Sequence, residues 1–558
     1  MRAAQMGMLD IRSTCEEDAP VRSLTVEAPD QRLKKTAILK SRFLHFLVAQ
    51  VSLCLVLLWI WPHLGIDDSY IFLTYARNLK ASGLFAFNPG EVTYGFSSPA
   101  YVMLLAAASR LSGIPVGPAL SNLLGVLLCG LSACAIWSLW GAINRQPSDR
   151  EMPLTAVLLS GPWFFTIWFV FGMETGLAVL SLLGFLLWLA KLRAGAPRFP
   201  WLIVGILATS IFAITRLESG IFIACGIIFA LATSRSRSEI RDLTTVALLS
   251  GGVEIAWLLY AKHTFGTYLP WTSTARLIYY MPGSLGLASA AQFYQLGVVG
   301  RSIVALKAVA QMFFAGPLKF LLVFVPLIAA AFYLRTQRSG ARMKWMLWVA
   351  TLGMALQIIA FAYLFPLAEN RHFAPYIAGI WVIVSAAIAR DIHRMGRFAH
   401  AAAITAVMVL WIGGAVRYRT GGMLLEPLHR LAASGYLLPT DKVAAEPIGI
   451  ISFETQSYII DLGGLTDRTA WPMLMQAKHE QLGNVIAWDS GKGATKVLFP
   501  ADDCGIHGRI FGTNCLMGAS DAKIFALHDG SLAKTAPTSA PATTTMTLHA
   551  VEAKPVSK

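Results

Sequence analysis

The sequence predicts a polytopic α-helical membrane protein with a C-terminal mixed α/β domain outside the membrane. Of its 558 residues, 56% are hydrophobic and only 14% are charged. Apolar runs long enough to cross a bilayer recur along the chain, separated by short polar loops. After about residue 416 these runs stop, and short β-like stretches alternate with glycine turns. A soluble globule could not bury so many apolar runs.

The charge of the chain fits a membrane partner. Lys and Arg number 46 against 31 Asp and Glu, which gives a formal net charge of +15. In a soluble protein this excess would suggest nucleic acid, but here the basic residues cluster in loops between apolar runs, as orientation signals do. We therefore expect a lipid bilayer as partner and no nucleic acid.

The N-terminal segment predicts the orientation of the chain. Residues 1–40 are polar and of mixed charge, and we expect a disordered cytoplasmic tail. Lys34, Lys35, Lys40 and Arg42 precede the first span, at about 43–64. By the positive-inside rule these basic residues keep the N-terminus in the cytoplasm, so the next loop emerges outside.

The membrane domain, residues 41–416, is expected to contain about eleven spans of ~17–25 residues each. Loops on the inner side then carry clusters of Lys and Arg, and outer loops are poorer in them. This orientation requires that 98–113 lies along the outer surface or dips into it, and 301–316 has the same ambiguity. The expected spans are 43–64, 115–142, 152–171, 175–190, 200–215, 218–234, 243–260, 317–334, 345–366, 373–390 and 398–416.

Two adjacent acids, Asp67 and Asp68, directly follow the first span. They open the first outer loop, residues 65–97, which is long for a mere connector. Each boundary charge alone is equally explained as a helix end in water, but a set on one face favours a site, because charges there are costly unless paired. The other outer boundary charges are Glu174, Arg216, Glu218, Arg276 and Arg371.

A short helix is expected to follow the paired acids, because Asp68 or Ser69 can cap a segment that runs to about Lys80. Tyr70, Thr74 and their neighbours recur there at helical spacing, which is typical of an amphipathic element on the membrane surface. The alternative is a plain connecting helix.

Nine motifs and one glycine occur in a fixed order along the chain. They are Asp67-Asp68-Ser69-Tyr70-Ile71, Tyr75-Ala76-Arg77-Asn78-Leu79, Gly83, Phe87-Asn88-Pro89-Gly90-Glu91, Gly95-Phe96-Ser97-Ser98-Pro99, Gly172-Met173-Glu174-Thr175, Thr215-Arg216-Leu217-Glu218, Phe265-Gly266-Thr267-Tyr268-Leu269-Pro270, Arg371-His372-Phe373-Ala374-Pro375-Tyr376 and Ile459-Ile460-Asp461-Leu462-Gly463-Gly464-Leu465-Thr466-Asp467. With these motifs the chain resembles, over about residues 67–468, bacterial GT-C glycosyltransferases, most closely the group of the mycobacterial terminal β-(1→2)-arabinofuranosyltransferase.

Two departures from the family pattern bear on the substrate. Thr215-Arg216-Leu217-Glu218-Ser219 stands where Thr-Arg-Pro-Glu-Gly is expected, and Pro270-Trp271-Thr272 stands where Pro-Asn-Thr is expected. Trp271 replaces a small amide with a stacking surface. These changes affect the choice of substrate more than the type of reaction.

The resemblance implies an inverting transfer of a sugar, with arabinofuranose suggested, from a polyprenyl-phosphate donor. The acceptor is a hydroxyl of a cell-envelope glycan or glycolipid on the outer face of the bacterial inner membrane. Asp67 is expected to be the base, and Asp68 to orient the acceptor or hold a divalent cation (Mg, Mn or Ca). The expected phosphate-binding residues are Arg371, then Arg216, then Arg276, and the expected supporting residues are Glu174, Glu218 and Tyr70.

The C-terminal part is expected to form a soluble outer domain over residues 417–533, followed by a disordered tail over 534–558. Its β-like stretches run from Ile448 to Phe453, Tyr458 to Asp461, Lys496 to Phe499 and Lys523 to His528. In an oxidising compartment Cys504 and Cys515 form a disulfide or remain free thiols. Trp471 or Trp488 would grip an acceptor glycan.

Two other functions fit the same composition. A transporter or flippase of lipid-linked sugars would need ionisable residues near mid-membrane and an internal repeat, and neither is evident in the sequence. A membrane protein that binds glycan without chemistry is the second alternative.

Overall fold

The structure of the chain is a computed structural model. It divides into two units, residues 1–45 and 46–558, and the packing of the helix bundle and of the last domain belongs to the second unit. The described residues are 29–61, 64–143, 146–160, 165–234, 236–275, 292, 295–314, 317–336, 340–364, 370–423, 425–445, 448–461, 463–471, 495–500, 522–528 and 531–533.

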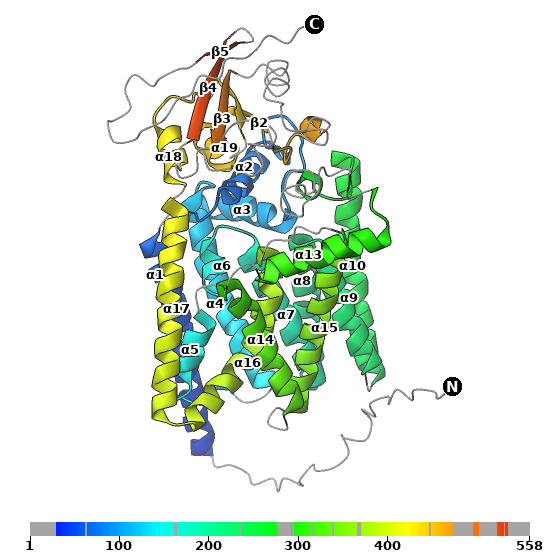
Figure 1. Cartoon of the computed structure of the whole chain (residues 1–558). Coiled ribbons are helices and arrows are strands. Elements are labelled where there is room, and N and C mark those ends of the chain that lie inside the picture. The colour runs from blue at the N-terminus through cyan, green and yellow to red at the C-terminus, as the bar shows by residue number, and fades with distance from the viewer. Residues whose placement is uncertain are drawn as a thin grey trace. The chain divides into compact units, whose positions relative to one another are not determined.

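All named secondary-structure elements in the described part of the membrane domain are helices (Figure 1). Helix α1 begins at Pro29, inside the segment expected to be disordered, so helical structure starts earlier than the sequence indicated. The helices are α1 (Pro29–Ile60), α2 (Asp67–Ser82), α3 (Pro99–Ser112), α4 (Pro118–Ile143), α5 (Met152–Ser160), α6 (Ile167–Val170), α7 (Thr175–Arg193), α8 (Arg198–Thr215), α9 (Ser219–Ala232), α10 (Arg237–Phe265), α13 (Val298–Phe314), α14 (Pro317–Arg335), α15 (Ala341–Leu364), α16 (Asn370–Arg394) and α17 (Arg397–Met423).

Among the described residues, eight helices are long and apolar enough to cross a membrane. They belong to α1, α4, α7, α8, α10, α15, α16 and α17, each at a predicted span, so the polytopic class is confirmed. The three other predicted spans differ. The segment 152–171 is two short helices, α5 and α6, on either side of residues 161–164, α9 has only 14 residues, and α14 contains Pro326.

The two ambiguous segments form helices shorter than a typical span. Helix α3 has 14 residues and α13 has 17. In Figure 1, α13 runs across the neighbouring helices instead of along them. Both observations agree with the expectation that these segments do not cross the bilayer.

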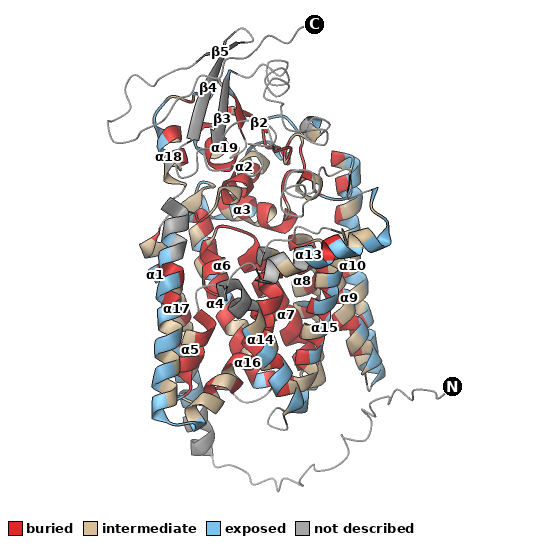
Figure 2. Cartoon of the chain, viewed as in Figure 1, coloured by how far each residue is buried: buried red, intermediate tan, exposed pale blue. Residues whose placement is uncertain are grey.

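Helices α7 and α16 are the most buried of the eight, whereas few residues of α1, α10 and α17 are buried (Figure 2). Two buried indoles tie the centre together. Trp140 Nε1 of α4 donates to the Val382 carbonyl at 2.8 Å, and Trp381 Nε1 of α16 donates to the Leu158 carbonyl at 2.9 Å. A buried indole N–H needs such an acceptor, because an unpaired polar group in an apolar interior is costly.

The last domain contains a five-stranded sheet of order β2-β1-β3-β4-β5. Strand β1 pairs in parallel with β2 and β3, while β3, β4 and β5 pair antiparallel. Strands β2, β3 and β4 lie where strands were expected. The bounds are β1 (Lys442–Ala445), β2 (Tyr458–Asp461), β3 (Lys496–Pro500), β4 (Ala522–His528) and β5 (Ser531–Ala533), with helices α18 (Glu426–Ala433) and α19 (Ile448–Thr455).

The expected strand from Ile448 to Phe453 is wrong, because these residues form helix α19. The helix runs alongside α2. Both carboxylate oxygens of Asp67 accept backbone hydrogen bonds at the α19 N-terminus, from Gly449 N at 2.9 Å and Ile450 N at 2.8 Å. Such contacts satisfy amides that have no partner within the helix and place a negative charge at the positive end of its dipole.

The other end of α19 meets a positive charge from the same helix α2. Arg77 Nη1 donates to the Phe453 carbonyl at 2.8 Å, and its guanidinium lies 5.2 Å from the Phe453 ring centre. Asp67 and Arg77, which both belong to α2, therefore complement the two ends of the α19 dipole. This pairing explains why a run rich in β-branched residues folds as a helix here.

The rest of the first loop also contacts the last domain. The Asn88 side chain donates to the Ile459 carbonyl and accepts from Ile459 N, both at 2.9 Å, so it pairs with the edge strand β2 as another strand would. Tyr458 Oη donates to Glu91 Oε1 at 2.6 Å. A Cβ on Gly95 would lie 2.7 Å from the Leu465 carbonyl oxygen, so only glycine fits there.

Replacing Gly449 should separate α2 from α19. A Cβ at this position would lie within 2.1 Å of the Asp67 carbonyl oxygen, and backbone atoms cannot yield as a side chain does. We expect Gly449→Ala to lower the unfolding temperature of the purified protein. Gly252→Ala in α10 is the matched control, since its Cβ meets nothing within 4 Å. Equal unfolding temperatures for the two variants would contradict the close approach.

The buried Asp461 should make stability depend on pH. Burial raises the pKa of its carboxyl from 3.8 to about 7, against hydrogen bonds from Thr466 and Gly463 that favour the ionised form. The folded state therefore binds the proton more tightly than the unfolded state, and stability should fall as pH rises from about 4 to 7 and then level off. Thermal unfolding across this range should show a smaller slope for Asp461→Asn; an unchanged slope would rule out this source.

Candidate active site

The start of α2 is held against the loop that precedes α7. Ser69 Oγ donates to the Phe171 carbonyl at 2.6 Å. Gly172 next to it has a φ of +72°, and a Cβ there would lie 2.7 Å from Leu64 Cδ2. The paired acids and residues 171–174 are thus fixed at one end of the helix bundle, the Asp67 end.

A buried ion pair lies at this end. Arg216, which ends α8, contacts Glu174 Oε1 through Nη2 at 2.8 Å, and both side chains are at most 3% exposed. Its Nη1 lies 3.4 Å from Glu218 Oε1, on a side chain that is 21% exposed. The other Glu174 oxygen, Oε2, has no hydrogen-bond partner among the described residues. Three of the boundary charges expected on one face therefore meet in one network.

The N-terminal turn of α16 lies at the same end. The Tyr376 ring packs on Phe212 of α8 and Phe222 of α9, with centroids 6.0 and 4.8 Å apart. Arg371 belongs to the first turn of α16, five residues before Tyr376, but its side chain lies outside the described part. Arg276, Cys504 and Cys515 also lie outside the described residues, so their expected roles stay predictions.

The two adjacent acids lie in the first turn of α2, and both are partly exposed. Both oxygens of Asp67 accept amide hydrogen bonds from α19, which stabilise the ionised carboxylate and fix its orientation. Each of these oxygens keeps a further lone pair that can accept a proton. The contacts therefore give Asp67 a structural role without excluding it as a base.

Tyr70 lies one turn into α2 and is almost fully buried. Its ring packs on His429 and Phe453 of the last domain, with centroids 5.5 and 5.8 Å apart. Burial, with the nearby carboxylates of Glu454 and Asp67, raises the pKa of its hydroxyl far above the ordinary value. Tyr70 thus stays protonated and can support the site by packing.

Sequence reasoning missed a second acid–base pair beside Tyr70. His429 Nδ1 of α18 lies 2.6 Å from Glu454 Oε1 of α19. No motif marks either residue, and Glu454 directly follows a run whose residue types favour a strand. Only the packing of α18 on α19 brings them together.

Aromatic side chains attach the first loop to α10. Trp257 Nε1 donates to Tyr94 Oη at 2.8 Å, and the Tyr94 ring stacks on Phe265 with centroids 4.5 Å apart. Trp271, the residue that departs from the family pattern, donates its backbone N–H to the Tyr94 carbonyl. The Arg468 guanidinium lies 5.5 Å from the Trp271 ring centre, so this tryptophan also contacts the last domain.

The residues do not fit a cation shared between Asp68 and Glu174. The Arg216 guanidinium contacts Glu174 and so brings a positive charge to where a metal would need negative ligands. Within the described ranges no three His, Cys, Asp or Glu side chains come together as a metal group. Glu174 is therefore better explained as the partner of Arg216.

Comparison with known proteins identifies the fold. No protein-family model and no curated protein matches the sequence. ArnT from Cupriavidus metallidurans, solved with bound undecaprenyl phosphate, aligns over 86% of this chain and 94% of its own, with a TM-score of 0.51 and 13% identity. The oligosaccharyltransferase of Archaeoglobus fulgidus in its apo form aligns over 84% and 70%, with a TM-score of 0.50 and 12% identity. Both are GT-C glycosyltransferases, and this chain has the GT-C fold.

Removing one partner of the buried ion pair should be costly. Glu174→Gln removes the charged partner of Arg216 Nη2 from a buried pair, and we expect the free energy of unfolding to fall by roughly 3–5 kcal/mol. Glu426→Gln is the matched control, because its pair with Arg430 is exposed and contributes about 0.5 kcal/mol. Thermal unfolding in detergent measures both. Similar small losses in the two variants would contradict a buried ionic pair.

Proposed function

We propose that this chain is an inverting glycosyltransferase that moves a sugar from a polyprenyl-phosphate donor to a hydroxyl of a glycan or glycolipid. The observation that carries the proposal is the convergence at the Asp67 end of a GT-C bundle. Two partly exposed carboxylates, Asp68 and Asp67, lie there near the buried Arg216 network, and Asp67 also binds helix α19 of the last domain. A lipid-linked donor keeps its tail in the bilayer and presents its sugar at such an end.

The lipid class of the donor is supported by the comparison. The ArnT structure holds undecaprenyl phosphate, which is a polyprenyl phosphate. The sequence resemblance suggests arabinofuranose as the first sugar to test, before a hexose or an aminosugar. We place the reaction on the outer face of the bacterial inner membrane, from the distribution of Lys and Arg between loops.

In the proposed reaction the acceptor hydroxyl attacks the anomeric carbon of the donor. Its proton passes to the Asp68 carboxylate as the new C–O bond forms. The bond between the anomeric carbon and the phosphate oxygen breaks, and the polyprenyl phosphate leaves with the electron pair. This assignment reverses the roles expected for Asp67 and Asp68, and it is supported by the structural role that the two α19 amide contacts give Asp67.

The leaving phosphate gains negative charge and needs cations nearby. Arg371 remains our first choice, because the turn of α16 that carries it lies at the Asp67 end. Arg276 is the second choice. Arg216 is disfavoured as a phosphate ligand, since its guanidinium already contacts two carboxylates. We assign it the role of positioning Glu174, with Glu218 as the second partner.

The roles of the two acids can be separated by activity and stability together. Asp68→Asn should lower transfer from polyprenyl-phosphate arabinofuranose, or another polyprenyl-linked sugar, by about 10²–10⁴-fold, with donor binding and unfolding temperature kept. Asp67→Asn should lower the unfolding temperature, because an amide cannot accept both α19 hydrogen bonds. Mass spectrometry of the product measures transfer.

Three results would overturn the proposal. Normal transfer by Asp68→Asn together with a 10²-fold loss in folded Asp67→Asn would make Asp67 the base. Unaltered surface glycans in cells that lack the protein would exclude a transferase. Loss of lipid-linked sugar translocation with transfer intact would identify a flippase.

A further inference from the structure

A pocket opens at the end of the bundle opposite to the Asp67 end. It has a volume of about 270 Å³ and lies between the last turn of α7, the first turns of α8 and α10, and the loop before α8. The positive ends of two helix dipoles, those of α8 and α10, meet at this pocket. Its polar lining residues are Lys191, Arg198, Trp201, Ser236, Ser238, Glu239 and Asp242.

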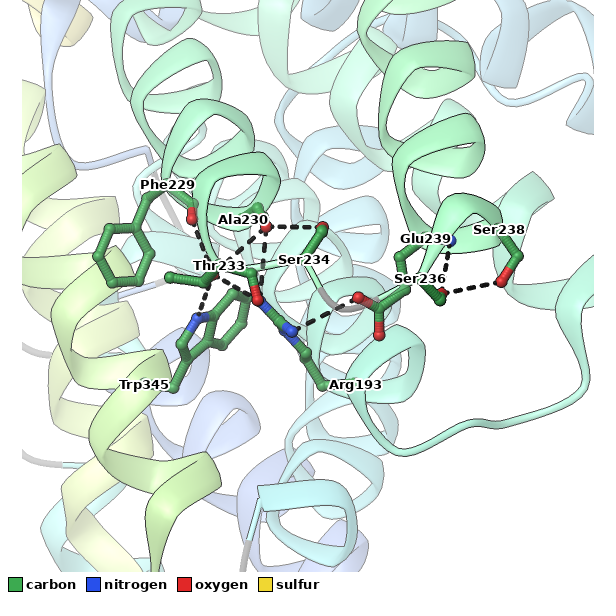
Figure 3. Close-up of polar contacts among 9 residues, drawn as sticks. All are labelled: Arg193, Phe229, Ala230, Thr233, Ser234, Ser236, Ser238, Glu239 and Trp345. Carbon is green, nitrogen blue, oxygen red and sulfur yellow. Dashed lines mark hydrogen bonds and ion pairs between the residues drawn. The ribbon is translucent and has the colours of Figure 1, made fainter. Parts of the chain in front are cut away.

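The wall beside the pocket is held by Arg193 (Figure 3). Its Nη2 donates to the Thr233 carbonyl at 2.7 Å, its Nη1 lies 3.5 Å from Glu239 Oε2, and its guanidinium lies 4.7 Å from the Trp345 ring centre. Trp345 Nε1 in turn donates to Thr233 Oγ1 at 3.0 Å. One arginine thus joins α7, α9, α10 and α15, so the pocket has a firm wall.

Among the charged residues that line the pocket, Lys191 is available to bind an anion. Asp242 is paired with Arg198, whose Nε lies 2.6 Å from its Oδ1, and Glu239 is paired with Arg193. Lys191 instead lies over the Trp201 ring, with Nζ 5.0 Å from the centroid, and no carboxylate pairs with it in the described part of the chain. A bound anion would therefore be attracted to Lys191 and the two helix N-termini.

The surface beside the pocket is apolar and exposed. Phe199, Ile203 and Leu207 are 73%, 41% and 55% exposed, and their four-residue spacing puts them on one face of α8. This face starts next to the pocket and continues along a helix that is long enough to cross a membrane. A ligand with an anionic head and a hydrocarbon tail matches both parts.

We propose that the pocket binds the phosphate of an anionic glycerophospholipid from the leaflet at this end, which the loop charges predict to be cytoplasmic. The phosphate contacts Lys191 and the Ser236 and Ser238 hydroxyls, and the acyl chains lie along Phe199 and Ile203. Basic pockets between transmembrane helices on the cytoplasmic side are suited to such head groups. The site is separate from the proposed transfer chemistry, which lies at the Asp67 end.

Native mass spectrometry of the full chain measures this binding directly. The protein is delipidated in detergent and mixed with phosphatidylglycerol, phosphatidylethanolamine or glycerol 3-phosphate at equal concentrations. We expect phosphatidylglycerol to be retained most. Lys191→Gln should lower its retention about fivefold. Ala196→Glu, on the exposed loop at the pocket rim, should lower it at least as much by adding a negative charge.

Arg397→Gln is the matched control, since this exposed basic residue lies at the same end but outside the pocket. It should retain the lipid as the unchanged protein does. Equal retention by the unchanged protein and both pocket variants would overturn the site. Equal binding of phosphatidylethanolamine would overturn the preference for an anionic lipid, and equal binding of glycerol 3-phosphate would show a soluble ligand instead.

Discussion

The contact between the Asp67 carboxylate and the α19 N-terminus joins the first loop to the last domain of the chain. Arg77 at the other end of α19 makes the arrangement specific, because a helix reversed in direction would meet both charges with the wrong sign. The pairing of Asn88 with strand β2 depends on the same placement. Loss of the Asp67 contact would affect all of these.

This constraint also separates two neighbouring acids that look alike in the sequence. Asp67 binds the N-terminus of α19, and Asp68 lies on the same turn of α2. The Glu174–Arg216 ion pair gives this end a buried polar network that resists rearrangement. A site built on rigid elements holds its reacting groups with the accuracy that transfer chemistry needs.

The membrane helices could largely be predicted from sequence, because length and apolarity are properties of each segment alone. The break between α5 and α6 was missed because the run from 152 to 171 is apolar, although Gly161-Pro162 inside it is a helix-breaking signal. Helix α19 resembles a strand in sequence because it is rich in β-branched residues, and the sequence does not show its contacts with Asp67 and Arg77. Strand β1 has only four residues, which is too short for a clear strand pattern.

The site could be predicted in part for the same reason. The acids and arginines at span boundaries identified the correct end of the bundle for Glu174, Arg216 and Glu218, which meet in space. The hydrogen bonds of Asp67 could not be predicted, because they come from backbone amides of α19, whose sequence favours a strand. The His429–Glu454 pair has no local pattern and became visible only in the fold.

The distance along the chain between Asp67 and Gly449 has a consequence for biosynthesis. The two residues are 382 positions apart, and at about 5–20 residues per second the ribosome needs roughly 20–80 s to pass from one to the other. Meanwhile the first loop is held by its own contacts, such as those of Asn78 with the Ala86 and Phe87 carbonyls. The paired acids therefore reach their final setting only after the ribosome has passed Gly449, so a chain truncated before α19 would lack this contact.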